Sequence, residues 1–304
     1  MNKHFSKHLS LSKIERIFWH AKFPKRKSCI RCGYRQLFKL SDDRYKCKRC
    51  RKKFSLFTNT YLNRAAILSD ELYELLWWFV YGFTANKTAK EIELPQKLVH
   101  HYFFTIRKGI SDCEENEMEK FFGEVEVDET YVGPKFKNRR KKKRDYLRKM
   151  NAVKRGRGSK ILHQPVFGIY QRNGKVYIKF VKDVSKKILQ DIIKGRIVLE
   201  SEVYSDTLLS YHGLDKKGYH HETVDHGRQE YFKKKQNKKI HINGIEGFWG
   251  YMKEHLLKHH GIAKNNLLYY VKEQEFRFNY RHLSTEEMIQ KLVEILVKFG
   301  PRND

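Results

Sequence analysis

Apolar residues in the first third of the chain recur every three or four positions. From Ser69 to Val80, leucine, phenylalanine and valine repeat at that spacing behind a serine that can cap a helix, which predicts one amphipathic helix. A helical stretch at 88–92, a break at Pro95 and a second helical stretch at 96–110 follow. Two helices joined by a short turn are typical of a helix-turn-helix motif. A helical linker that only packs against its neighbours gives the same pattern.

Alternation of apolar and polar residues takes over after residue 120. Residues 124–132 alternate valine with polar side chains and predict a strand. Two further strands at 166–171 and 175–181 are joined by an Asn-Gly pair, which is a strong hairpin signal. A short helix at 185–193 and a fourth strand at 197–204 come next. Two hairpinned strands, a crossover helix and a further strand resemble the opening of an RNase H-like fold, which is an α/β fold with a mixed sheet.

Two aspartates hold matching positions in this pattern. Asp128 lies on the polar face of the first strand, and Asp206 comes just after the fourth. The first and fourth strands of an RNase H-like sheet lie side by side, and active-site residues gather where such strands end. We therefore expect Asp128 and Asp206 to meet.

A third acidic residue lies on a predicted helix that begins near residue 241. Its apolar stripe consists of Ile245, Phe248, Trp249, Met252 and Leu256. Glu246, Gly250 and Lys253 share the next face, and Asn243 lies one turn earlier. A carboxylate and an ammonium along one line suit a metal ion and a phosphate group. Residues 266–279 predict a final helix in the core, with Arg277 free to contact DNA.

The charge of the chain favours a polyanionic partner. It has 64 Lys and Arg against 35 Asp and Glu, a formal net charge of +29. Nucleic acid is the best candidate, while ribosomal or membrane-surface binding is open on charge alone. Fourteen basic residues crowd residues 135–160, opposed only by Asp145, and predict a mobile basic loop that clamps duplex phosphates or is simply solvated. The candidate contacts there are Arg139, Arg140, Lys141, Lys142, Arg155 and Arg157.

Four of the five cysteines form two close pairs near the start of the chain. Cys29-x2-Cys32 and Cys47-x2-Cys50 are separated by fourteen residues, a spacing typical of a zinc ribbon with one structural Zn²⁺. Four thiolates leave no open position for water, so this zinc would be structural. Paired cysteines of this kind also favour a reducing compartment over a disulfide scaffold.

Nearby polar residues are candidates for DNA contact. Arg49 and Lys52 lie beside the second cysteine pair, where the alternative is a solvated charged surface. Gln96, Lys97 and His100 would face double-stranded DNA if the helix-turn-helix interpretation holds. The most apolar stretch, 72–83, is too short to cross a bilayer, and the N-terminus has no signal-peptide core. We therefore expect an intracellular protein without a membrane partner, in the cytoplasm or nucleoid of a prokaryote or the nucleus of a eukaryote.

The acidic residues also fit a catalytic metal site. Mg²⁺ or Mn²⁺ prefers carboxylate oxygens, and two such ions can activate an attacking oxygen and stabilise a leaving one. Asp128, Asp206 and Glu246 would be the ligands. For each acid taken singly, the alternative is a surface salt bridge to a nearby Lys or Arg.

Several motifs taken together resemble a known family. The cysteine pairs, the helices, Val-Asp-Glu-Thr-Tyr-Val-Gly, Tyr-Ser-Asp followed by Tyr211, and Asn-x2-Glu-Gly-Phe-Trp are similar to zinc-ribbon insertion-sequence transposases related to Merlin elements. The resemblance implies an RNase H-like, DDE-type integrase core that excises and inserts DNA. Asp128, Asp206 and Glu246 match its catalytic acids and Lys253 its associated lysine, with Asn243 as an alternative third ligand. It also implies a dimer or larger homo-oligomer on element ends and target DNA.

These observations predict three domains. A zinc ribbon with an N-terminal helix covers 1–62, a helix-turn-helix-like domain 66–118, and the catalytic domain, with its basic loop, 121–299. The leading hypothesis is a DNA transposase that cleaves and transfers strands in a metal-dependent reaction. A catalytically silent or domesticated DNA-binding regulator and an RNase H-like nuclease without strand joining are the alternatives.

Overall fold

The computed structural model describes residues 11–42, 44–63, 69–117, 119–133, 140–149, 163–224, 233–235 and 238–300. Its contacts divide the chain into two compact units. The first consists of Met1–Asn116 with Tyr280–Asp304, and the second of Glu117–Asn279. Among the described residues, no helix is long and apolar enough to span a bilayer.

The first unit begins with a helix and a small antiparallel sheet. Helix α1 (Leu11–Lys22) precedes strands β1 (Leu37–Lys39), β2 (Tyr45–Cys47) and β3 (Lys53–Phe54), which pair in that order. The sheet brings the two cysteine pairs together around buried Phe54. This arrangement is compatible with the predicted zinc ribbon.

Three helices follow in the first unit. They are α2 (Ser69–Val80), α3 (Ala85–Glu91) and α4 (Gln96–Glu117), and α2 confirms the predicted amphipathic helix because its leucines are buried. Thr84 caps α3 by accepting a hydrogen bond from the Lys87 N–H at 3.4 Å. Four residues separate α3 from α4, as expected for a helix-turn-helix-like segment.

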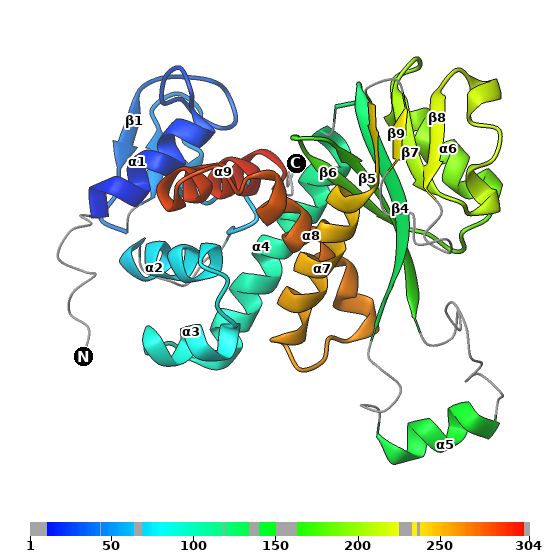
Figure 1. The fold of residues 1–304 in the computed structure, drawn as a ribbon. Coiled ribbons are helices and arrows are strands. Elements are labelled where there is room, and N and C mark those ends of the chain that lie inside the picture. Colours follow the sequence, from blue (N-terminus) through cyan, green and yellow to red (C-terminus); the bar gives the residue numbers. More distant parts are fainter. Residues whose placement is uncertain are drawn as a thin grey trace. The chain divides into compact units, whose positions relative to one another are not determined.

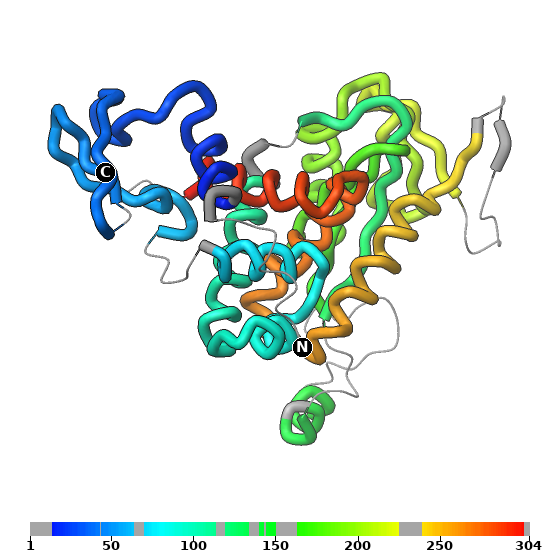
Figure 2. Tube along the Cα trace, turned by 90° about the vertical axis from the view of Figure 1, so that its left-hand side faces the viewer, coloured from blue at the N-terminus to red at the C-terminus, as the bar shows by residue number. Residues whose placement is uncertain are grey.

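The last helix of the chain belongs to this unit. Helix α9 (Thr285–Lys298), red in Figures 1 and 2, starts at a capping box formed by Ser284 and Glu287 and packs on α1 and α2. Ile289, Leu292 and Leu296 are buried along this helix. The division of the chain thus differs from the predicted one, which ended the catalytic domain at 299 and took 266–279 as the final helix.

The second unit is built on a five-stranded mixed sheet. Strands β4 (Glu124–Val132), β5 (Gln164–Gln171), β6 (Val176–Phe180), β7 (Glu202–Asp206) and β8 (His220–Val224) lie in the order β6-β5-β4-β7-β8. The pairs of β4 with β7 and of β7 with β8 are parallel, and the other two are antiparallel. Counted within the sheet this is 3-2-1-4-5, consistent with an RNase H-like core, and it confirms the predicted fold class.

The predicted fourth strand starts later than expected. Ile197 makes only an isolated bridge to Phe121, and regular pairing begins at Glu202. Glu200, at a φ of 65°, interrupts the extended backbone between them. At the other end, pairing with β8 continues through Asp206, which is therefore the last residue of β7 rather than a residue beyond it.

Helices cover both faces of this sheet (Figure 1). Helix α6 (Lys186–Arg196) packs on the face that carries Val125 and Val127. Helices α7 (Asn243–Leu257) and α8 (Leu267–Asn279) pack on the other, where Trp249 and Met252 join the core. A hairpin of β9 (Lys233–Lys235) and β10 (Lys238–Ile240) precedes α7. Short 3₁₀ turns lie at Leu209–Tyr211, Asp215–Lys217 and Lys264–Asn266.

Part of the predicted basic loop is helical. Residues Lys141–Lys149 form α5, in which Arg148 pairs with Asp145 at 3.5 Å. Lys and Arg are good helix formers, and basic residues in the last turn suit the helix dipole. The predicted loop is therefore helical at Lys141–Lys149, although this segment consists mostly of basic residues.

The outer edge of the sheet, strand β6, is bonded by side chains of α8. Asn279 accepts from the Val176 N–H at 2.7 Å and donates to the Val176 carbonyl at 2.9 Å. About two turns away, Lys272 donates to the Ile178 carbonyl at 2.8 Å and forms a buried ion pair with Glu275 at 2.7 Å. Arg277 is also buried, paired with Glu273 at 2.7 Å, so the expectation that it is free to contact DNA is wrong.

Candidate functional site

Strand register brings two aspartates together. In the parallel pair of β4 and β7, Glu126 lies opposite Tyr204, and two residues further along each strand are Asp128 and Asp206. Side chains two residues apart share a face, so both aspartates point to the face that α7 covers. Carboxylate oxygens of Asp128, Asp206 and Glu129 all lie within 4.8 Å of one another. Three carboxylates this close form a group that could hold a metal ion.

Helix α7 reaches this group through Trp249. Its indole Nε1 donates a hydrogen bond of 2.9 Å to Oδ2 of Asp128. The ring fits because the residue opposite Asp128 on β5 is Gly168, where an added Cβ would come within 2.6 Å of the indole. Gly168 thus lets the ring lie against the sheet.

The electrostatics of the site favour a cation or a proton. Burial, Glu129 and Asp206, in that order, raise the pKa of Asp128 to about 8. Burial lowers the pKa of Lys253, while the Asp128 charge opposes that change. The Lys253 ammonium on α7 therefore interacts electrostatically with the Asp128 carboxylate.

Glu129 was missed by sequence reasoning. The Tyr211 hydroxyl donates to its Oε2 at 2.9 Å, and burial keeps the pKa of Tyr211 well above its ordinary value, so the donor stays protonated. On the neighbouring strand, Asp206 Oδ1 accepts from the Leu208 N–H at 2.9 Å. The available signals were the acid directly after Asp128 and the tyrosine soon after Asp206. Strict strand alternation, however, places Glu129 on the face opposite to that of Asp128.

The remaining predicted catalytic residues lie on α7. Asn243, Glu246 and Lys253 are exposed. Glu246 is not part of the group of carboxylates within 4.8 Å of one another. It lies three residues before Trp249, on the helix that contacts Asp128, and its role stays a prediction.

A second buried carboxylate on β4 was also missed. Glu126, fully buried, binds the Arg172 Nε at 2.9 Å and the backbone N–H of Ile245 at 2.9 Å. His241 Nδ1 lies 3.3 Å from the same carboxylate. These partners are 46 and 119 residues away for Arg172 and Ile245, so local pattern could not identify them.

The four paired cysteines form one cluster in the first unit. Their sulfurs lie within 4.8 Å of one another, with Cys29 to Cys50 at 3.5 Å and Cys32 to Cys47 at 3.7 Å. Zinc–sulfur bonds of about 2.3 Å in a tetrahedron require sulfurs about 3.8 Å apart. The donor set therefore fits one tetrahedral zinc.

The backbone of the two knuckles supports the cluster. The residue after each pair, Gly33 and Arg51, is left-handed, at φ of 69° and 59°. These turns close with hydrogen bonds from the Gly33 N–H to the Cys29 carbonyl at 3.0 Å and from the Arg51 N–H to the Cys47 carbonyl at 3.1 Å. Burial raises the pKa of Cys47, but hydrogen bonds from the N–H groups of Cys50 and Arg49 outweigh this effect. The net result is a pKa lowered to about 7. A thiolate is thus accessible near neutral pH.

Most predicted DNA contacts in the described part of the chain are exposed. They are Arg49, Lys52, Gln96, Lys97, His100, Arg140, Lys141 and Lys142. His100 also bonds to Asn86 Oδ1 at 2.7 Å, which ties α4 to α3. Arg139, Arg155 and Arg157 lie outside the described residues.

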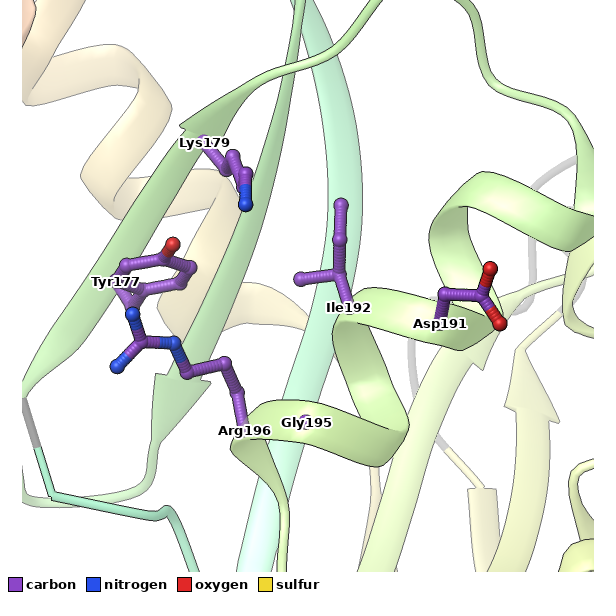
Figure 3. A pocket seen from close by; sticks show the side chains of 6 residues that line it. All are labelled: Tyr177, Lys179, Asp191, Ile192, Gly195 and Arg196. Carbon is purple, nitrogen blue, oxygen red and sulfur yellow. The ribbon is translucent and has the colours of Figure 1, made fainter. Parts of the chain in front are cut away.

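A shallow pocket lies on the other face of the sheet. It has a volume of about 230 Å³ and is lined by Tyr177 and Lys179 of β6 and by Asp191, Ile192, Gly195 and Arg196 of α6 (Figure 3). The Arg196 guanidinium lies 4.5 Å from the Tyr177 ring centre. None of these lining residues belongs to the carboxylate group.

Comparison with known proteins gives consistent matches. Residues 120–279 match the family of ISXO2-like transposase domains. An "uncharacterized transposase-like protein" of Haemophilus influenzae is 37% identical over 117 residues, which are 38% of this chain and 91% of that protein. An "uncharacterized protein in transposable element ISH50" of Halobacterium salinarum is 25% identical over 271 residues, covering 88% of this chain and 87% of that protein.

Proposed function

The chain belongs to the ISXO2-like transposase family, and we propose that it cuts and joins DNA strands at Asp128 and Asp206. The observation that carries this proposal is the strand register, which sets Asp128, in the middle of β4, level with Asp206, the last residue of β7. Glu129 adds a carboxylate within 4.8 Å of both. A site of three close carboxylates in a chain of net charge +29 combines a cation site with attraction to phosphate.

Each residue has a proposed role. Asp128 and Asp206, with Glu129 beside them, would hold Mg²⁺ or Mn²⁺, and Glu246 would join as the third acid of a DDE-type site, with Asn243 as the alternative. When bound, two such ions supply activation of the attacking oxygen and stabilisation of the leaving oxygen. Lys253 would contact a phosphate oxygen of the DNA.

The reaction has two in-line steps at phosphorus. In the first, water attacks a phosphodiester, the bond to the 3′ oxygen breaks, and a 3′-hydroxyl and a 5′-phosphate result. In the second, that 3′-hydroxyl attacks a phosphodiester of the target, and a 3′-hydroxyl of the target leaves. In each step the attacking water or hydroxyl loses a proton to solvent or to a carboxylate of the site, and the leaving 3′ oxygen takes one up.

The first unit would recognise DNA. Cys29, Cys32, Cys47 and Cys50 would hold one structural zinc, and the exposed basic residues around it, with α4, would contact double-stranded element ends. Because two ends must be paired, we expect a dimer or larger assembly on DNA. These roles follow from the family and from the exposed positive charge.

The test is cleavage and strand transfer on labelled DNA from the flanks of the encoding gene, with Mg²⁺ or Mn²⁺. We compare the wild type with Asp206→Ala and with the control Asp191→Ala, which removes an exposed acid on α6. The proposal is supported if the wild type and Asp191→Ala give joined product and Asp206→Ala gives none. Full activity of Asp206→Ala would end the site assignment.

Two other outcomes favour the alternatives. Cut product that never becomes joined to target would indicate a nuclease of RNase H-like fold. Tight DNA binding without product from any of the three proteins would indicate a silent or domesticated regulator.

A further inference from the structure

Two hydrogen bonds join helix α7 to the central strand β4. The Ile245 N–H donates to Glu126 at 2.9 Å, and the Trp249 indole donates to Asp128 at 2.9 Å. Both acids lie on one face of β4. The helix that carries Glu246 and Lys253 is therefore attached to the strand at two points.

The spacing of the two attachment points matches on both elements. Glu126 and Asp128 are two residues apart, which is about 6.7 Å along a strand. Ile245 and Trp249 are four residues apart, which is about 6 Å along a helix. Because these lengths nearly agree, both bonds form together when α7 runs along β4 in this register. A shift of one residue would turn the helix by about 100° and break both.

Glu126 serves as the missing cap of α7. The N-cap residue is Ile242, whose side chain has no hydrogen-bond acceptor. The third helical N–H, that of Ile245, donates instead to the Glu126 carboxylate. Gly244 permits this approach, because a Cβ there would come within 2.9 Å of the Glu126 carboxylate and 2.2 Å of the Tyr170 ring.

Arg172 holds Glu126 in place. Its Nε donates to Glu126 at 2.9 Å, and its two terminal nitrogens donate to the carbonyls of Lys239 at 2.8 Å and His241 at 2.9 Å. The same guanidinium therefore binds the strand and the segment that enters α7. Its side chain is 11% exposed, so water competes little for these bonds.

We propose that Glu126, held by Arg172, is a positioning residue that fixes the register of α7 along β4. This register sets the Trp249 indole on Asp128 and fixes the position along β4 of the helix that carries Glu246 and Lys253. The inference rests on the proposed function for its kinetic consequence only. Its structural consequence, the position of Trp249, can be measured without any activity.

The test separates side-chain length from charge. Glu126→Asp keeps the charge for Arg172 but is too short to reach the helix unless α7 moves. Glu126→Gln keeps the length and the acceptor for Ile245 but loses the charge. Glu124→Asp is the matched control, because Glu124 also binds Arg172, at 2.8 Å, but is half-exposed and has no bond to α7 among those described.

Indole ¹⁵N labelling reads out the register. The chain has four tryptophans, so four indole cross-peaks are expected, and loss of one in Trp249→Phe assigns that of Trp249. Glu126→Asp should move the Trp249 peak, while Glu126→Gln and Glu124→Asp leave it near the wild-type position. The peaks of Trp19, Trp77 and Trp78, in the other unit, should not move.

Strand-cleavage kinetics test the consequence for the site. A displacement of about 1 Å can cost a hundredfold in rate, so we expect kcat of Glu126→Asp to fall by about that factor with little change in DNA Kd. Glu126→Gln should stay within about tenfold of the wild type, since it keeps the positioning bond.

Two results would overturn the inference. One is a Glu126→Asp protein with the wild-type Trp249 peak and the wild-type kcat. The other is a larger loss in Glu126→Gln than in Glu126→Asp, which would mean that charge rather than length matters. A moved peak in Glu126→Asp with no cleavage by any protein, wild type included, would uphold the register and refute the proposed function instead.

Discussion

Replacing Asp128 with Asn should make the metal-free protein more stable at alkaline pH. Burial and the charges of Glu129 and Asp206 raise the pKa of Asp128 from 3.8 to about 8. Between those values the native state keeps a proton that the unfolded chain has released, so the free energy of unfolding falls as the pH rises. Asn has no proton to lose, and its carbonyl oxygen still accepts the Trp249 hydrogen bond.

The magnitude follows from this pKa. Each pH unit is worth about 1.4 kcal/mol, so the whole interval corresponds to about 5–6 kcal/mol. Asp128 keeps partial contact with water, and the Lys253 ammonium is close, which both reduce this value. We expect Asp128→Asn to match the wild type near pH 5 and to exceed it by about 1–3 kcal/mol at pH 8.

The assay is urea unfolding followed by the Trp249 indole cross-peak, which reports the unit that contains the site. The buffer lacks Mg²⁺ and Mn²⁺ but contains no chelator, so that the cysteine cluster is undisturbed. The difference in free energy of unfolding between the two proteins is the quantity to compare. Groups that titrate equally in both proteins do not contribute to it. A difference that stays constant from pH 5 to pH 8 would refute the reasoning.

Adding Mg²⁺ should remove most or all of this stability difference at pH 8. A ligand that binds only the native state at a hundred times its Kd stabilises it by about 2.7 kcal/mol. The wild type should gain this and Asp128→Asn should gain much less. Equal gains would mean that Asp128 is not a metal ligand.

Three further predictions concern other parts of the molecule. Cys32→Ser should lose the bound zinc and lower the melting temperature of the first unit, whereas Cys113→Ser should keep one zinc per chain by elemental analysis. Lys272→Met should cost about 3–5 kcal/mol in thermal unfolding at pH 7, because Glu275 is left buried without its partner, and a second change of Glu275→Gln should restore most of it. Gly168→Ala should destabilise by about 1–3 kcal/mol and shift the indole that lies on it, because the new methyl would come within 2.6 Å of the ring.

The sequence predicted the parts of the fold that depend on local periodicity. Strand alternation identified β4, the Asn-Gly pair identified the β5–β6 turn, where Asn173 has a φ of 58°, and the helical stripes identified α2 and α7. From these, the order of elements was enough to bring Asp128 and Asp206 together. Strand alternation, the Asn-Gly pair and the helical stripes are all local signals. The topology could be predicted from them because the order of the elements along the chain resembles that of an RNase H-like fold.

Features that depend on distant partners could not be predicted. Glu126 looked like any polar residue of an alternating strand, and only Arg172 and Ile245 explain why it is buried. Lys272 is likewise buried only because a strand edge lies beside it. Hydrophobic periodicity indicates which face of a helix is buried, but it does not identify the element that packs against that face. For the same reason the sequence could not assign the last helix of the chain to the first unit.

The side chains that bond to the edge of β6 also bear on self-association. A free strand edge presents unpaired N–H and carbonyl groups that can template pairing with another chain, which leads to aggregation. Here Asn279 already bonds to the N–H and the carbonyl of Val176, while Ile178 donates its N–H to Glu275 and accepts from Lys272. If several copies gather at high local concentration on DNA, their sheets are hindered from fusing along this edge. Any assembly they form must then use other surfaces, which would keep the copies separable once the DNA is released.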